Sequence, residues 1–209
     1  MSKVHLNVIN KSQKSLNGQS IVIFQKNCAM DYDEWAVAWK VIDNHGYGWS
    51  HPFEYSFEQE IGAMDSWGNK IGESLPAEYG KLYYAYRDSS GDHLGCFGAG
   101  SSSDEIQIRN DFPTGSVQAC IYRERGKVAE KFNVAPSQKA IFKFKPTIWI
   151  GVASGVQEND GMNTAITESM TTEICLTGIK SADIILTDGK EESMMGSYEF
   201  AMENVICEK

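Results

Sequence analysis

Aromatic and histidine side chains in turn-forming segments are the residues of this chain best suited to binding chemistry. Trp49 and His51 share one short segment, Trp67 lies in an Asp-Ser-Trp-Gly-Asn turn sequence, and Tyr83 lies on the side of its strand that we expect to be polar. An aromatic ring stacks on the apolar face of a sugar while carboxylates, amides and imidazoles bond the sugar hydroxyls. These four side chains are therefore the candidate ligand-binding residues. The alternative is that the rings fill the edge of a core.

Metal and nucleophile chemistry have weaker support. His93 precedes Cys96 by three residues, a spacing that supplies two metal ligands or a thiol with a nearby base. A structural zinc needs four ligands and a catalytic zinc three, and His5, His45 and His51 form no second pair at a matching spacing. No Gly-x-Ser-x-Gly sequence is present. We expect no catalytic residue, no metal site and no cofactor.

Clustered carboxylates keep a hydrolase open as an alternative. Two carboxyl groups that flank a glycosidic bond are enough to hydrolyse it. Glu54, Glu58 and Glu60 alternate with Phe53 and Tyr55, which places all three acids on the polar face of an expected strand. Solvation on that face is the ordinary explanation for them.

The net charge of −9, from 28 acidic and 19 basic residues in a chain of 209, bears on the class of partner. Phosphate backbones are bound by clustered Lys and Arg, and the basic residues here are scattered. We therefore expect no nucleic-acid partner. Neutral lipid headgroups, carbohydrates and basic proteins remain as classes of partner.

The cysteines and the amino terminus suggest a cytoplasmic protein. The five cysteines are far apart and odd in number, which is typical of reduced thiols rather than of a secreted disulfide framework. No apolar segment of the signal-peptide kind follows Met1, and no apolar run approaches the length of a spanning helix. We expect a soluble protein, with export by a route that needs no signal peptide left open.

Alternating apolar residues between Gly115 and Ser154 give the clearest prediction of secondary structure. Three alternating segments joined by tight turns, followed by Pro146–Val152, predict a β-meander. One face of it would carry Val117, Ala119, Ile121, Val128, Phe132, Val134, Ala140, Phe142 and Phe144.

Similar patterns occur along the rest of the chain. We expect strands at 4–8 and 21–24 that pair with each other, and an extended segment at 35–42 for which helix is the competing interpretation. We also expect a strand at 52–61 and a hairpin formed by 81–87 and 94–98.

These patterns predict an all-β fold: one domain over residues 1–209, a two-sheet antiparallel β-sandwich of about twelve strands with at most one or two short helical turns near Met162–Met170. The segments 7–26 and 105–123 share a strand, polar turn, strand pattern, which we interpret as the rhythm of the fold rather than a repeat. In its size and in the pattern of its N-terminal residues the chain resembles small β-sandwich lectins and lipid-binding cytolysins, at the level of fold alone.

The function we expect is non-catalytic binding through the end loops of a sandwich. The expected ligand is a carbohydrate or another cell-surface component such as a lipid headgroup, held by Trp49, His51, Trp67 and Tyr83. The first alternative is a structural or self-assembling protein, because the strand expected at 198–205 has few inward charges or prolines to block edge pairing into a homo-oligomer. The second alternative is the hydrolase.

Overall fold

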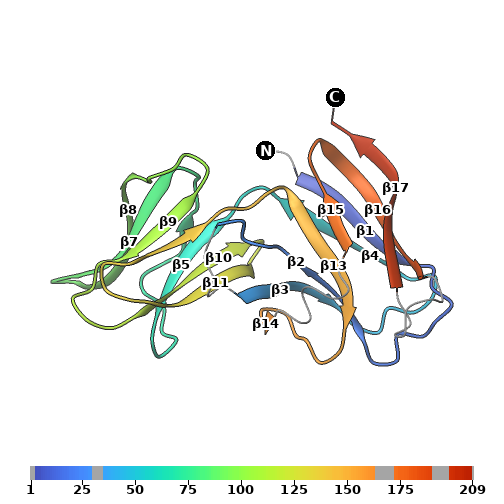
Figure 1. The fold of residues 1–209 in the computed structure, drawn as a ribbon, viewed down its shortest axis with the longest axis horizontal. Coiled ribbons are helices and arrows are strands. Elements are labelled where there is room, and N and C mark those ends of the chain that lie inside the picture. Colours follow the sequence, from blue (N-terminus) through green and yellow to red (C-terminus); the bar gives the residue numbers. More distant parts are fainter. Residues whose placement is uncertain (1–2, 30–34, 163–171, 190–197, 209) are drawn as a thin grey trace. The chain divides into compact units, whose positions relative to one another are not determined.

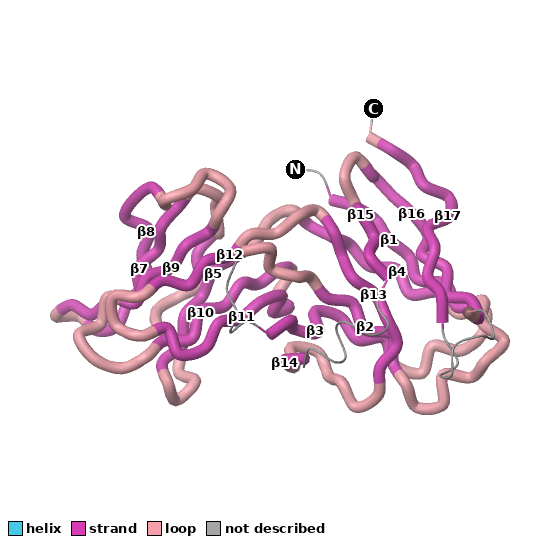
Figure 2. Tube along the Cα trace, viewed as in Figure 1, coloured by secondary structure: helices cyan, strands magenta, loops and turns pink. Residues whose placement is uncertain are grey.

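The computed structural model describes residues 3–29, 35–162, 172–189 and 198–208 (Figure 1). Within these ranges every regular element is a β-strand (Figure 2), which confirms the all-β class and the antiparallel sandwich architecture, with more strands than the dozen expected. The described part of the chain has no helix long and apolar enough to cross a membrane. Met162 lies in a strand, and residues 163–171 of the expected helical segment lie outside the described residues.

Internal contacts divide the chain into two compact units. Unit 1 consists of Met1–Gln25, Ala38–Phe57 and Pro146–Lys209, and unit 2 of Lys26–Val37 and Glu58–Lys145. Each unit is described by itself below. The prediction of one domain across the whole chain stays a prediction.

Unit 1 contains two sheets. Its strands are β1 (Lys3–Asn10), β2 (Ser20–Phe24), the larger part of β3 (Trp35–Ile42), β4 (Ser50–Ser56), β13 (Thr147–Ala153), β14 (Gly161–Met162), β15 (Thr172–Cys175), β16 (Ile179–Asp188) and β17 (Tyr198–Cys207). One sheet has the order β17-β16-β1-β4, and the second has the order β15-β13-β2-β3, with β14 paired to β3. β1 and β16 are parallel, whereas β1–β4, β16–β17, β13–β15, β13–β2 and β2–β3 are antiparallel.

Aromatic side chains join the two sheets of unit 1. Trp39 on β3 meets Phe53 and Tyr55 on β4 edge to face, with ring centroids 6.1 and 6.0 Å apart. Such pairs add about 0.5–1.5 kcal/mol each beyond the area they bury. The buried Gln25 amide donates to the Tyr55 hydroxyl at 3.0 Å, so the polar tip of that ring is also satisfied inside the core.

Unit 2 also contains two sheets. Its strands are β5 (Glu60–Asp65), β6 (Leu75–Pro76), β7 (Lys81–Asp88), β8 (Gly91–Ala99), β9 (Ile106–Asn110), β10 (Val117–Arg123), β11 (Gly126–Val134) and β12 (Lys139–Phe142). The sheet orders are β12-β9-β7-β8 and β11-β10-β5-β6. The first residues of β3 belong to this unit, where Ala36 pairs with Ala129 of β11.

The two units share one topology. The order β17-β16-β1-β4 of unit 1 corresponds to β8-β7-β9-β12 of unit 2, and β15-β13-β2-β3 corresponds to β6-β5-β10-β11. The strand directions also agree, because β9 is parallel to β7 as β1 is to β16, and the remaining equivalent pairs are antiparallel in both units. Only β14 of unit 1 has no equivalent among the described strands.

The correspondence extends to one buried asparagine in each unit. The Asn10 amide donates to the His45 carbonyl at 2.6 Å, and its side-chain oxygen accepts from the Ser12 backbone N–H at 2.9 Å. In unit 2, Asn110 donates to the Val134 carbonyl at 2.8 Å and accepts from the Phe112 N–H at 3.0 Å. We call these two arrangements the Asn10 latch and the Asn110 latch. Each ties the end of a middle strand to a distant turn.

Several expectations about strand partners are wrong. β1 and β2 do not pair, because each lies in the middle of a different sheet. β10 and β11 form a hairpin, but β12 pairs with β9 and β13 belongs to unit 1, so the segment 115–154 is not a continuous meander. The expected strand 52–61 is divided into β4 and β5, one in each unit.

Other expectations about secondary structure are confirmed. Residues 35–42 are extended as β3, not helical, and β7 and β8 form the expected hairpin. Every residue of β2 is buried, as its unbroken apolar run predicts for a strand covered on both faces. Along the predicted apolar face of 117–144, Phe132 is the exception, since it is partly exposed.

Replacing either latch asparagine should destabilise the protein. In Asn10→Ala one carbonyl and one N–H lose their partner, and in Asn110→Ala two carbonyls and one N–H do. A buried unsatisfied polar group costs about 1–3 kcal/mol. We expect each variant to lower the free energy of unfolding in urea by about 2–4 kcal/mol. The control Gln157→Ala, at an exposed loop residue, should stay within about 0.5 kcal/mol of the parent. Equal stability of Asn10→Ala and the control would show that the latch contributes nothing.

Candidate functional site

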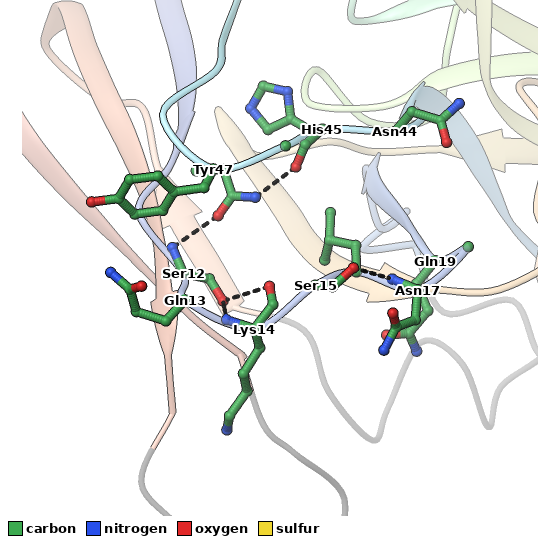
Figure 3. A pocket seen from close by; sticks show the side chains of 13 residues that line it. Ser12, Gln13, Lys14, Ser15, Asn17, Gln19, Asn44, His45 and Tyr47 are labelled. Carbon is green, nitrogen blue, oxygen red and sulfur yellow. Dashed lines mark hydrogen bonds between the residues drawn. The ribbon is translucent and has the colours of Figure 1, made fainter.

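A pocket of unit 1 lies between the β1–β2 loop and the β3–β4 turn (Figure 3). Its volume is about 420 Å³. It is lined by Asn10 and by residues 12–19 and 44–47. Besides the latch residue Asn10, the lining contains four amide side chains, those of Gln13, Asn17, Gln19 and Asn44, and we call it the amide pocket.

The Asn10 latch fixes the two walls of the amide pocket relative to each other. Its two bonds join Ser12 of one wall to His45 of the other, as the dashed lines beside these residues show (Figure 3). The backbone of Asn10 adds two more bonds, donating to the Trp49 carbonyl at 3.1 Å and accepting from the Gly48 N–H at 2.7 Å. The pocket is therefore held open by the protein itself, before any ligand arrives.

The residue types at the tips of the loops follow from their backbone conformations. Asn17, Gly18, Asn44 and Gly48 all have positive φ, between 46° and 80°. Only glycine adopts this region freely, and asparagine is the usual alternative because its short side chain bonds locally. The same residues that allow the chain to turn thus place amide groups at the rim.

Two aromatic rings stand on the β3–β4 turn. Tyr47 lines the pocket and is 64 % exposed, and Trp49, the residue before β4, is 62 % exposed. The Trp49 indole lies against Gly46, whose Cβ position would be 3.7 Å from the ring. His51 is exposed on β4, opposite Val8 of β1. Trp49 and His51 are accessible, as the sequence predicted, although Tyr47 is the ring that lines the pocket.

His45 supports the pocket from behind. Its ring is buried and Nε2 lies 3.2 Å from the Val8 carbonyl oxygen, so this nitrogen donates. Burial lowers the pKa of His45 below its ordinary value of 6.5, and the nearby His51 lowers it further. The imidazole is neutral at pH 7 and acts as a fixed support rather than as a proton donor to a ligand.

A second pocket, of about 240 Å³, lies in unit 2 beside Trp67. Trp67 is 86 % exposed. The carboxylate of Asp65 accepts the backbone N–H groups of Trp67 and Asn69 at 2.8 Å each, which confirms the turn chemistry predicted for this segment. The Asn69 side-chain amide also donates to this carboxylate and is the largest cause of the lowered pKa of Asp65.

Tyr83 is not available to a ligand. It is buried in unit 2, where its hydroxyl donates to the Pro76 carbonyl at 2.6 Å and accepts from the Glu78 N–H at 3.0 Å. Burial raises the pKa of this hydroxyl. The expectation that Tyr83 faces the polar side of its strand is wrong, because the half-buried Tyr84 and Tyr86 occupy the outer face instead.

The geometry of β8 does not join His93 and Cys96 into a nucleophilic site. His93 and Cys96 are three residues apart on β8 and project to opposite faces of the strand. The His93 Nε2 atom lies 2.8 Å from the Ser90 hydroxyl and 3.1 Å from an Asp88 oxygen. A Ser-His-Asp relay needs the serine and the acid on different ring nitrogens, and here both share one.

The carboxylates of the hydrolase alternative are also dispersed. Glu54 belongs to unit 1 and accepts a bond from Lys3 at 2.6 Å, whereas Glu58 and Glu60 belong to unit 2 and are exposed. The described residues hold no group of three or more His, Cys, Asp or Glu side chains that could bind a metal ion.

Comparison with known proteins gives no guide to this site. No family model, curated protein or solved structure matches the chain. The chemistry of the pockets is therefore the only basis for a function.

Sequence reasoning missed the amide pocket. Its amides lie in two segments, 12–19 and 44–47, that are separated by two strands, and no spacing in the sequence joins them. The signal that was present is local: Asn17-Gly18 and the run from Asn44 to Gly48 are both dense in turn-forming polar residues.

The buried His45 predicts a specific dependence of stability on pH. Its pKa is lower in the folded than in the unfolded state, so its contribution is fully present above pH 6.5 and is lost as the pH falls toward the folded pKa. Urea unfolding between pH 8 and pH 5 should show the free energy of unfolding falling below pH 6.5, by up to about 1.4 kcal/mol per pH unit. The variant His45→Gln should lack this component. An identical slope in both proteins would contradict it.

Proposed function

We propose that this protein is a non-catalytic carbohydrate-binding protein and that the amide pocket holds a neutral sugar. The observation that carries the proposal is a pocket whose walls are latched together and whose rim combines amides with the exposed ring of Tyr47. An amide both donates and accepts, which matches the donor and acceptor character of a sugar hydroxyl. Tyr47 supplies the surface for stacking.

The size and charge of the pocket support a neutral ligand. A volume of about 420 Å³ falls within the usual range for small-molecule sites. Among the lining residues Lys14 is the one permanent charge, and Asp188 accepts the Gln13 backbone N–H at 3.1 Å. The lining contains no Asp or Glu, so the pair of carboxyl groups needed for glycoside hydrolysis is missing from it. The site is suited to holding a sugar and not to cleaving it.

The cysteines support synthesis in a reducing compartment. All five are free, and three of them, Cys96, Cys175 and Cys207, are exposed. Exposed free thiols are typical of cytoplasmic proteins. We therefore retain the cytoplasm as the proposed location, with the ligand reached either there or after export.

The proposal is tested by binding to immobilised glycans and to liposomes. We expect the protein to bind neutral glycans, and Tyr47→Ala to weaken that binding by about tenfold, because a lost stacking contact of about 1.4 kcal/mol corresponds to that factor. The control is Phe132→Ala, which removes a partly exposed ring on β11 of unit 2 and should bind as the parent does. Binding to liposomes alone would favour a lipid headgroup. Failure on both surfaces would refute the proposal.

Self-assembly remains the second candidate, because β17 is an exposed edge strand. It ends the order β17-β16-β1-β4 and exposes Val205 and Ile206. An edge of this kind can pair with another chain. If assembly is the function, sedimentation velocity should show species that grow with concentration and that Ile206→Lys abolishes. A single monomeric species at high concentration would remove this candidate.

A further inference from the structure

The pocket beside Trp67 occupies a place in unit 2 that is related to the place of the amide pocket in unit 1. One wall of the amide pocket is the loop between β1 and β2, and one wall of the Trp67 pocket is the loop between β9 and β10. These strands are equivalent in the shared topology. Both loops leave a middle strand at a latch asparagine. The remaining walls come from different turns in the two units.

The Asn110 latch gives the Trp67 pocket a rigid wall. Besides the Val134 carbonyl, the Asn110 amide reaches the Gly115 carbonyl at 2.9 Å, so the loop is held at both its beginning and its end. The Phe112 N–H donates to the same side chain at 3.0 Å. Gly115 has a φ of 88°, which lets the short loop close.

The opposite wall presents Trp67 in a fixed position. Asp65 holds the backbone on both sides of this ring, and Gly68, with a φ of 84°, completes the turn. A ring that is 86 % exposed contributes little to the core of its own unit. Because the turn is already ordered, stacking a ligand on the indole requires little additional ordering of the chain.

The charges of this pocket point to a neutral polyol. Arg87 binds Asp92 through two bonds of 2.5 and 3.0 Å and lies 5.6 Å from the ring centre of Phe112. Asp65 also lines the pocket, so the lining contains two carboxylates and one guanidinium, and an anionic sugar is disfavoured. Each carboxylate oxygen accepts more than one bond, which leaves Asp92 able to accept from a sugar hydroxyl.

We propose that the Trp67 pocket is a second site for a neutral sugar, so that one chain holds two ligands, one in each sandwich. This inference rests on the proposed function of the amide pocket and adds valency to it. Trp67 stacks on the ligand, and the Arg87–Asp92 pair bonds its hydroxyls. A monomer of this kind cross-links surfaces that carry the sugar.

The test uses the full chain and agarose beads that carry mannose, galactose or glucose. Sedimentation first establishes that each protein is monomeric at the concentration used. The parent and the control Phe132→Ala should agglutinate the beads that carry the sugar they bind. Trp67→Ala and Asp92→Asn should still bind those beads through the amide pocket, but the protein concentration required for agglutination should be at least tenfold higher than for the parent. Both changes are at accessible side chains, and unchanged circular dichroism and unfolding curves would show that the fold is retained.

The outcomes separate the two proposals. Equilibrium binding of the soluble sugar should give two sites for the parent and one for Trp67→Ala. If the parent binds one sugar per chain, or if Trp67→Ala agglutinates beads as well as the parent does, the second site is refuted and the proposal for the amide pocket is unaffected. If Tyr47→Ala abolishes all binding, the second site is refuted as well. If the parent binds none of the three sugars, binding of a simple neutral sugar by either pocket is refuted.

Discussion

Backbone N–H and carbonyl groups that are buried at the end of a middle strand, β1 or β9, must find hydrogen-bond partners, and the rest of the structure depends on this requirement. At that point the chain leaves one sheet and crosses to the other, and the hydrogen bonds between strands no longer satisfy every backbone N–H and carbonyl. Asn10 and Asn110 solve the problem in the same way, with one amide that donates to a turn and accepts from the loop that follows. A shorter side chain could not reach both groups, and an apolar one could bond neither.

Both pockets are built on this arrangement. A latched strand end is rigid, so the loop beyond it is free to vary in length and composition without loosening the core. In unit 1 the loop is long and amide-rich and closes against the β3–β4 turn. In unit 2 the loop is short and carries Phe112, and the pocket opens toward Trp67 and the Arg87–Asp92 pair. One scaffold thus supports two pockets of different composition.

The sequence predicted individual strands well but strand pairing poorly. Alternation shows that one face of a strand is buried, but not which strand lies beside it, so the sequence predicts that β1 and β2 pair although they belong to different sheets. The alternation of Leu82, Tyr84 and Tyr86 predicts that these three side chains form the apolar face and that Tyr83 lies opposite them. The burial of Ala85 with Tyr83 shows which set faces inward. Trp49, His51 and Trp67 are exposed as expected, since glycine, proline and asparagine around them fix those segments as turns or strand ends. The amide pocket needed long-range contacts that no spacing encodes.

The pattern shared by residues 7–26 and 105–123, interpreted from sequence as rhythm, marks equivalent strands: β1 with β2, and β9 with β10. Followed along the chain, the equivalence pairs β1–β8, in order, with β9–β13 and β15–β17. Each sandwich therefore takes four strands from the amino-terminal half and four from the carboxy-terminal half, β14 aside. A half-length chain would complete neither sandwich. Two such half-chains could form both sandwiches only by exchanging strands, and in the present chain the two halves are covalently joined and exchange strands within one molecule.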